Sequence, residues 1–302
     1  MERLVSEFAV DPEAIDDWRT LQLLDASFGW ERGRLIARFP KKWFQMVSER
    51  LSKGFVSDAK VELCLQSLKG KAIRLGRPKE LGPGDWLANA RREHVRHPFH
   101  AIITRENSST EPFILQIDEL HDGTPRWQVP TDLAVAREAS DMASVIAHLL
   151  AHSTDVVFID PYFHPKKNKF VRPLRAFCKA AKHPNYATKT FHYHLLKSAD
   201  WELADFERDC LNELPLVIPT GINVEFHIWS ERMGGQSFHD RFICFKEGAI
   251  SWGHGLDDNP HADGIVNVRL LSKAALQLRQ AEFDLQTSPF EFLRCIRVEG
   301  RR

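Results

Sequence analysis

The feature that most constrains the fold is an alternation of strand-like and helix-like segments, which begins near Ser140 and continues to the end of the chain. The strand patterns are DVVFIDPYF (155–163), KTFHYHLL (189–196), NVEFHIW (223–229), SFHDRFICF (237–245) and GIVNVRLL (264–271). The helical patterns between them are MASVIAHLLAH (142–152), FVRPLRAFCKAAK (170–182), ADWELADFERDCLNEL (199–214) and SKAALQLRQAEFDLQ (272–286). This alternation predicts an α/β domain, with a β-sheet flanked by helices.

The first 140 residues do not show this alternation of strands and helices. Apolar residues recur at helical spacing through about residue 55, and two short strand patterns follow, HAIITR (100–105) and FILQID (113–118). A single core tends to divide beyond roughly 250 residues, and the chain has 302. We therefore predict two domains: an α+β recognition or assembly domain over 1–140, and the α/β domain over 141–302.

Composition excludes several classes of protein. No stretch reaches the roughly 18 apolar residues of a membrane helix, and the amino terminus is acidic rather than basic and apolar, so we expect a cytoplasmic protein without membrane contact. The five cysteines are widely spread and never spaced C-x-x-C, so neither a disulfide framework nor a cysteine-based zinc site is expected. No motif indicates a cofactor.

Charge is balanced overall, with 41 basic and 41 acidic side chains, but it is unevenly distributed. Residues 161–197 contain no Asp or Glu and these cations: Lys166, Lys167, Lys169, Arg172, Arg175, Lys179, Lys182, Lys189 and Lys197. Such a tract can bind a polyanion, and Lys166 and Lys167 are candidate phosphate-binding residues. Alternatively, the tract is only a solvated face, neutralised by the acidic helical segment that follows it.

The segment SFHDRFICF contains the residues best suited to chemistry. In a strand, residues two apart share a face, so His239 and Arg241 are expected side by side, with Phe238, Asp240 and Phe242 on the other face. A guanidinium binds phosphate oxygens bidentately, and an imidazole beside it can attack phosphorus or protonate a leaving group. The pair is therefore a candidate phosphodiester site that needs no metal.

The segment HDRFICFKEGAISWGHGLDD, together with DVVFIDPYF and NVEFHIW before it, resembles the phospholipase D-like superfamily, and more narrowly its bacterial H-D-R-F branch associated with phage-defence loci. The resemblance covers roughly residues 142–290. It implies a mixed β-sheet flanked by helices, His239 as the nucleophile that forms a phosphohistidine, Arg241 as phosphate ligand, and Gly253 and Gly255 as the turn beside the phosphate. Asp257 and Asp258 are candidates for the carboxylate that orients the imidazole.

Such a site uses two histidines, and this chain has one full motif, so we expect a homodimer that brings two copies of His239 together. The expected function is a metal-independent nuclease of prokaryotic antiviral defence. The alternative is an inactive module that binds nucleic acid (DNA or RNA) or another defence protein. Lys246 and Gly255 favour this alternative, because the motif has an acidic residue and a hydroxyl there. Phospholipid hydrolysis is a weaker third option.

His192 and His194 form an H-x-H pair on a predicted strand, which is a spacing that can hold a metal ion. No third ligand follows at a recognisable spacing, so the sequence favours chance or a phosphate contact, and no metal site is predicted.

Overall fold

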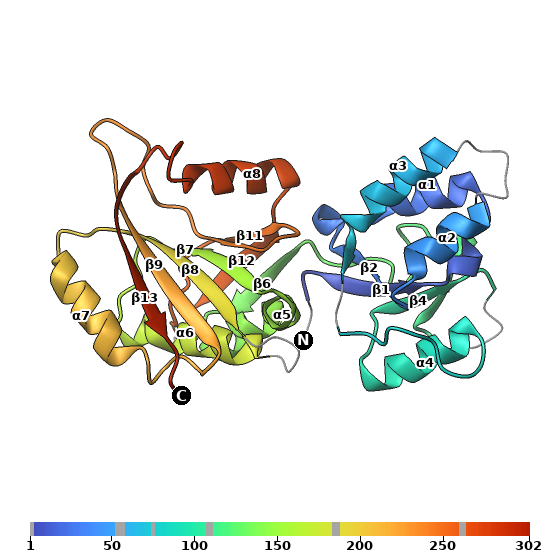
Figure 1. The fold of residues 1–302 in the computed structure, drawn as a ribbon, viewed down its shortest axis with the longest axis horizontal. Helices are drawn as coiled ribbons and strands as arrows, with labels where there is room; N and C mark the ends of the chain where they lie inside the picture. Colours follow the sequence, from blue (N-terminus) through green and yellow to red (C-terminus); the bar gives the residue numbers. More distant parts are fainter. Residues whose placement is uncertain (1–2, 52–57, 74–75, 107–110, 183–187, 260–263) are drawn as a thin grey trace. The chain divides into compact units, whose positions relative to one another are not determined.

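The structure is a computed structural model that describes residues 3–51, 58–73, 76–106, 111–182, 188–259 and 264–302. It divides the chain into two compact units, Arg3–Thr131 and Asp132–Arg302, each with its own sheet (Figure 1). Strand β6 (Asp132–Ala136) pairs with β12 (Ile265–Leu270), so residues that precede the expected boundary at 140 belong to the sheet of the carboxy-terminal unit. Within the described residues, no helix is both long and apolar enough to cross a membrane.

The amino-terminal unit contains a five-stranded sheet in the order β3-β2-β1-β4-β5, and every neighbouring pair is parallel. Its strands are β1 (Ser6–Val10), β2 (Arg34–Ala37), β3 (Ala72–Ile73), β4 (Ala101–Thr104) and β5 (Ile114–Gln116). The prediction of an α+β unit is therefore wrong, because a parallel sheet with helical connections is an α/β arrangement.

Helices cover both faces of this sheet. The described helices are α1 (Trp18–Ser27), α2 (Trp43–Leu51), α3 (Asp58–Lys69) and α4 (Trp86–Arg96), with 3-10 turns at Pro12–Ala14, Trp30–Arg32 and Ile117–Glu119. One core joins α1, α2 and α3 to one face of the sheet, and a second joins α4 to the other. Trp43 anchors α2, since its ring is fully buried and its indole N–H donates to the carbonyl of Val10 at 2.6 Å.

The carboxy-terminal unit contains an eight-stranded mixed sheet in the order β13-β9-β8-β7-β10-β11-β12-β6. Strands β7, β8 and β9 are parallel, whereas the other pairings are antiparallel. The remaining strands are β7 (Asp155–Ile159), β8 (Lys189–Leu196), β9 (Ile222–Ser230), β10 (Phe242–Cys244), β11 (Ala249–Trp252) and β13 (Glu291–Glu299). Its helices are α5 (Ala139–His152), α6 (Asn168–Ala181), α7 (Leu203–Glu213) and α8 (Lys273–Glu282). The predicted α/β class is confirmed.

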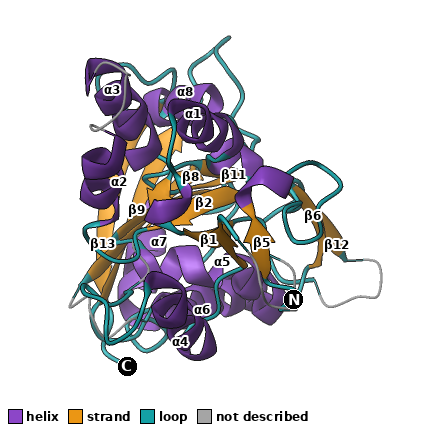
Figure 2. Ribbon diagram, turned by 90° about the vertical axis from the view of Figure 1, so that its right-hand side faces the viewer, coloured by secondary structure: helices purple, strands orange, loops and turns teal. Residues whose placement is uncertain are grey.

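The two faces of this sheet differ. Figures 1 and 2 show α5 and α6 below the sheet and α8 above it. Alternate residues of β8 point to the α6 side, where Tyr193 stacks on Phe158 with ring centroids 4.5 Å apart. The intervening residues, including His192 and His194, point to the α8 side, because successive strand residues face opposite ways. On that side α8 covers one end of the sheet through a core that includes Trp229, Phe242 and Leu276.

The segment SFHDRFICF is a strand only from Phe242 to Cys244. The predicted strand is therefore too long, and His239 and Arg241 lie in the loop that enters β10. Phe238 and Phe242 are buried on the α8 side and His239 is exposed, as the predicted alternation requires, but Asp240, expected on the face of the two phenylalanines, is exposed as well.

Candidate phosphate-binding site

His239 is held between two hydroxyl groups. Its Nε2 lies 2.7 Å from Ser237 Oγ, and its Nδ1 lies 3.4 Å from the phenol oxygen of Tyr162. Tyr162 comes from the loop that follows β7, so two segments far apart in the sequence position this ring.

The Glu231 carboxylate accepts a hydrogen bond from the same Ser237 hydroxyl. Ser237 Oγ donates to Glu231 Oε1 at 3.0 Å, and the backbone N–H of Phe238 donates to the same oxygen at 2.7 Å. These two hydrogen bonds lower the pKa of Glu231, which is consistent with an ionised acceptor. A serine hydroxyl has one proton, so Ser237 accepts from His239 Nε2–H. The lone pair of the neutral imidazole is then on Nδ1, which faces Tyr162.

Beside Tyr162 lies a hollow of about 240 Å³ with a strongly charged lining. The residues that line it are Arg137, Asp160, Tyr162, Lys169, Phe170, Arg241, His254, Gly255 and Asp257. Lys169 and Phe170 are in the first turn of α6, where the helix dipole favours an anion. Three permanent cations against two carboxylates make this hollow a candidate phosphate-binding pocket, a name used for it below.

Asp160 and Arg241 each have a buried polar atom in the pocket region. Burial raises the pKa of the Asp160 carboxyl to about 6, whereas a hydrogen bond from the Tyr162 backbone and the charge of Arg241 act in the opposite direction. Within the described residues, no hydrogen-bond partner meets Asp160 Oδ2 or Arg241 Nε, although both atoms are buried. The Arg241 guanidinium also lies 4.8 Å from the centre of the Tyr162 ring, so Tyr162 contacts both residues of the predicted pair.

The structure places the predicted pair in neighbouring hollows. Arg241 lines the phosphate-binding pocket, whereas His239 lines an adjoining niche of about 10 Å³ with Ser237 and Phe238. Tyr162 stands between them, because it lines the pocket and contacts His239. The imidazole therefore lies outside the pocket lining and is connected to it through Tyr162.

Of the two predicted turn glycines, Gly255 lines the pocket. Gly253 directly follows β11, and its N–H donates to the carbonyl of Asn267 at 3.0 Å. A Cβ at position 255 would lie 2.4 Å from Asp257 Oδ1. A larger residue there would push this carboxylate out of place.

The predicted orienting carboxylates have other partners. Asp257 binds Arg137 and also Lys169, the latter at 3.1 Å, and Asp258 binds Arg172 at 3.0 Å. Among the described contacts, none joins either aspartate to His239; the carboxylate linked to this ring is Glu231, through Ser237. Of the predicted lysines, Lys166 pairs with Asp209 at 2.8 Å and Lys167 is exposed before α6, and neither lines the pocket.

Sequence reasoning did not single out Arg137, Tyr162, Glu231 or Ser237. Arg137 precedes α5 and is more than 100 residues from Arg241, so no local spacing could indicate it. Tyr162 was visible only as the end of a predicted strand, and Ser237 only as the start of another.

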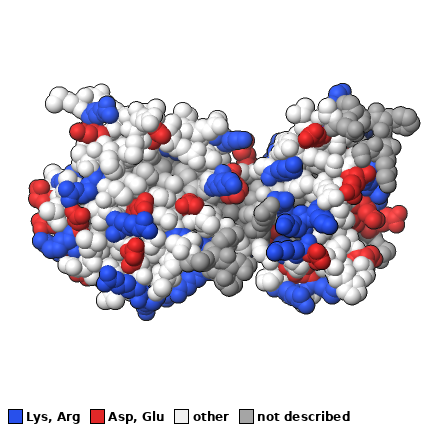
Figure 3. Space-filling view, in the orientation of Figure 1, with Lys and Arg blue, Asp and Glu red and all other residues white. Residues whose placement is uncertain are grey.

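The basic tract of residues 161–197 is partly neutralised within its own unit. Lys189 is buried, and its ammonium donates to the carbonyls of Leu150 and Ala151 at the end of α5, at 2.8 and 2.5 Å. Figure 3 shows a row of Lys and Arg side chains along the lower edge of the unit, where α6 lies. Lys179 and Lys182 are exposed there.

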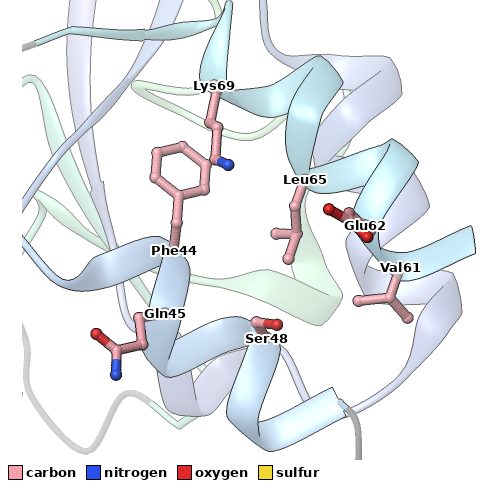
Figure 4. Close-up of a pocket in the computed structure, with 7 residues that line it drawn as sticks. All are labelled: Phe44, Gln45, Ser48, Val61, Glu62, Leu65 and Lys69. Atoms are coloured by element: carbon pink, nitrogen blue, oxygen red, sulfur yellow. The ribbon is translucent and has the colours of Figure 1, made fainter. Parts of the chain in front are cut away.

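A larger hollow, of about 560 Å³, lies between α2 and α3 of the amino-terminal unit (Figure 4). Phe44 and Leu65 are the largest apolar residues in its lining, and Gln45, Ser48, Glu62 and Lys69 contribute polar groups. Among the hydrogen bonds of the described residues, none joins the Ser48 hydroxyl of this lining to a base, so we do not assign catalysis to this hollow.

Comparisons with known proteins do not assign a family. No family model matches the chain, and no curated protein matches it. Among solved structures, it is similar to TrmBL2, an archaeal chromatin protein described as showing a novel mode of DNA binding. The two chains are 10% identical, with a TM-score of 0.28 over 91% of this chain and 99% of that one. A TM-score this low carries no argument about fold or function.

Proposed function

We propose that the chain is a phospholipase D-like, metal-independent phosphodiesterase with nucleic acid as its substrate. The observation that carries the proposal is the position of His239 Nδ1 against Tyr162, which lines the phosphate-binding pocket. Arg241, Lys169 and the first turn of α6 provide positive charge for the non-bridging oxygens of a phosphodiester.

In the proposed reaction, Nδ1 of His239 attacks phosphorus and the bond to the leaving oxygen breaks. Ser237 and Glu231 stabilise the positive charge that develops on the ring, because Nε2–H already donates toward them. The leaving oxygen takes a proton from a second histidine, and water then hydrolyses the phosphohistidine. In a homodimer the second histidine is His239 of the other copy, which matches the single motif in the sequence.

The test is hydrolysis of labelled single- and double-stranded DNA and RNA in excess chelator. The wild-type chain should cleave at least one of them, and His239→Ala should lose the activity, because removal of a covalent nucleophile leaves only binding. Asp240→Ala is the matched control, since this neighbouring carboxylate is largely exposed and its ion pair among the described residues is with Arg279, at 3.5 Å. Activity that chelator abolishes and Mg²⁺ restores would contradict the proposed mechanism.

A second candidate is an inactive phospholipase D-like module that binds nucleic acid or a partner protein of a defence system. It is favoured by the ion pairs that Asp257 makes with Arg137 and Lys169, which neutralise part of the pocket, and by the location of His239 outside its lining. Retained nucleic-acid binding by a wild-type chain that cleaves none of the four substrates would support this candidate.

A further inference from the structure

Two neighbouring strands of the carboxy-terminal sheet bring a carboxylate and two imidazoles together. In the parallel pairing of β8 and β9, His192 lies opposite Glu225, and His227 follows two residues later on the same face. His192 Nδ1 is 3.3 Å from Glu225 Oε2 and 3.3 Å from His227 Nε2, and the last two atoms are 3.6 Å apart. Three ligand-type atoms thus form a nearly equilateral triangle.

We propose that His192, Glu225 and His227 bind a divalent transition-metal ion of the zinc class. Two imidazoles and a carboxylate are a ligand set that Zn²⁺ takes, at about 2.0–2.2 Å from each atom, and tetrahedral ligands at that distance are about 3.4 Å from one another. The triangle therefore has the size that the ion requires. The proposal is independent of the phosphodiesterase function proposed above.

Hydrogen bonding alone accounts less well for this triangle. A proton on His192 Nδ1 can point to Glu225 or to His227, but not to both. His227 Nε2 is 3.6 Å from Glu225 Oε2, which is too long for a hydrogen bond of its own. A metal ion at the centre of the triangle would satisfy all three atoms together.

Further charged groups surround the triangle in the way that outer-shell partners surround a bound metal. Asp155 Oδ1 lies 3.8 Å from His192 Nε2, on the side of the ring opposite Nδ1, and Arg297 lies 3.7 Å from the second oxygen of Glu225. At 3.8 Å Asp155 acts through its charge and not through a hydrogen bond, and this charge favours a proton on Nε2 and a lone pair on Nδ1. His194 stacks on His227 with ring centroids 4.8 Å apart and fixes its plane.

The three side chains are about one-fifth to one-quarter exposed, at 26% for His192, 21% for Glu225 and 19% for His227. An ion held by three protein ligands at such a surface keeps a coordination position open to water. Cys295 of β13 lies opposite His227 in the strand register, so its thiol is a candidate for the fourth ligand.

The proposed metal site is distinct from the phosphate-binding pocket. Its three ligands lie on β8 and β9, whereas none of the described residues that line the pocket belongs to either strand. Removal of the ion should therefore leave phosphate binding intact.

The test uses the full chain, stripped with chelator and titrated with Zn²⁺ by calorimetry against a competing chelator. We expect one Zn²⁺ per chain, lost in His192→Ala and in His227→Ala, and retained in His254→Ala, which removes an exposed histidine of the same unit. Asp155→Asn should keep the stoichiometry and weaken binding about 10- to 100-fold, as loss of an outer-shell partner does. Cys295→Ser should lower affinity only if sulfur is a ligand.

Wild-type chain that binds no stoichiometric Zn²⁺, or that binds it equally well after His192→Ala and His227→Ala, would overturn the proposal. If His227→Ala does not fold, as judged by circular dichroism, His192→Gln provides the same test at the more exposed ligand. The absorption spectrum of bound Co²⁺ gives a second readout, because a four-coordinate site differs from free ion. Failure of this test would leave the phosphodiesterase proposal untouched.

Discussion

Ser237 Oγ lies 2.7 Å from Nε2 of His239 and donates to Glu231, so the imidazole is linked through one hydroxyl to a carboxylate of the same loop, between β9 and β10. Sequence reasoning expected the orienting carboxylate at Asp257 or Asp258, within the motif itself. In the structure those two side chains pair with cations.

Ser237→Ala should lower kcat about 10- to 100-fold under the proposed mechanism. A hydrogen bond to a charged group contributes about 1.5–3 kcal/mol, and 1.4 kcal/mol corresponds to a factor of ten in rate. KM should change little, because Arg241 and Lys169 are unaffected. Steady-state kinetics with Ser237→Thr as the conservative control, which keeps the hydroxyl, would check this. Equal losses in the two variants would mean that packing, rather than the hydroxyl, matters.

Asp160→Asn should make stability less dependent on pH. The folded-state pKa of Asp160 is raised from 3.8 to about 6, so its stabilising contribution is complete below about pH 3.8 and is lost as pH rises through about 6. The asparagine variant does not ionise and should be more stable than wild type at pH 8, by up to about 3 kcal/mol for a shift of roughly two units. Urea unfolding at pH 5 and pH 8 measures this. A gap between the two proteins that is the same at both pH values would argue against the raised pKa.

The same substitution should strengthen anion binding. At pH 8 the wild-type pocket contains the charges of Asp160 and Asp257 against three cations, and Asp160→Asn removes one of the two opposing charges. Phosphate or oligonucleotide affinity should therefore rise at pH 8 and depend less on pH between 5 and 8. Asp141→Asn on α5, outside the pocket lining, is the matched control.

Lysines of the basic tract should differ in their effect on nucleic-acid binding. Lys169→Ala removes a cation from the pocket lining, so the slope of log K against log salt should fall by about one. Lys166→Ala should change it less, because Lys166 is outside the pocket lining, although each of the two lysines pairs with an aspartate. Fluorescence anisotropy across a salt series would distinguish them. Equal slopes for Lys169→Ala and wild type would place the nucleic acid elsewhere.

Mixing subunits tests the proposed composite site. If two copies of His239 form one site, heterodimers of wild-type and His239→Ala chains lack either the nucleophile or the acid and should be nearly inactive. Activity should then follow the fraction of wild-type homodimers, and analytical ultracentrifugation would establish that dimers form. Heterodimers with half the wild-type activity would make each chain's site self-sufficient.

The hydrophobic periodicity of each segment was sufficient to predict most helices and strands of the carboxy-terminal unit. Amphipathic helices such as α5 and α6 show helical periodicity in their own residues, and strands with strict alternation such as β12 show a period of two. The amino-terminal strands β1 and β2 have no such alternation, because every one of their residues is buried. A fully buried strand of four or five residues cannot be distinguished from a piece of helix by periodicity.

By itself the sequence determined the α/β class, the neighbourhood of His239 and Arg241, and the face of β8 shared by His192 and His194. Only the tertiary structure decided which residues complete each group: Tyr162, from a distant loop, and Glu231, from the same loop, near His239, and Glu225 and His227 rather than His194 beside His192. The physical reason is that a strand's own residues fix which way each side chain faces, whereas its neighbours depend on pairing register between strands more than 30 residues apart.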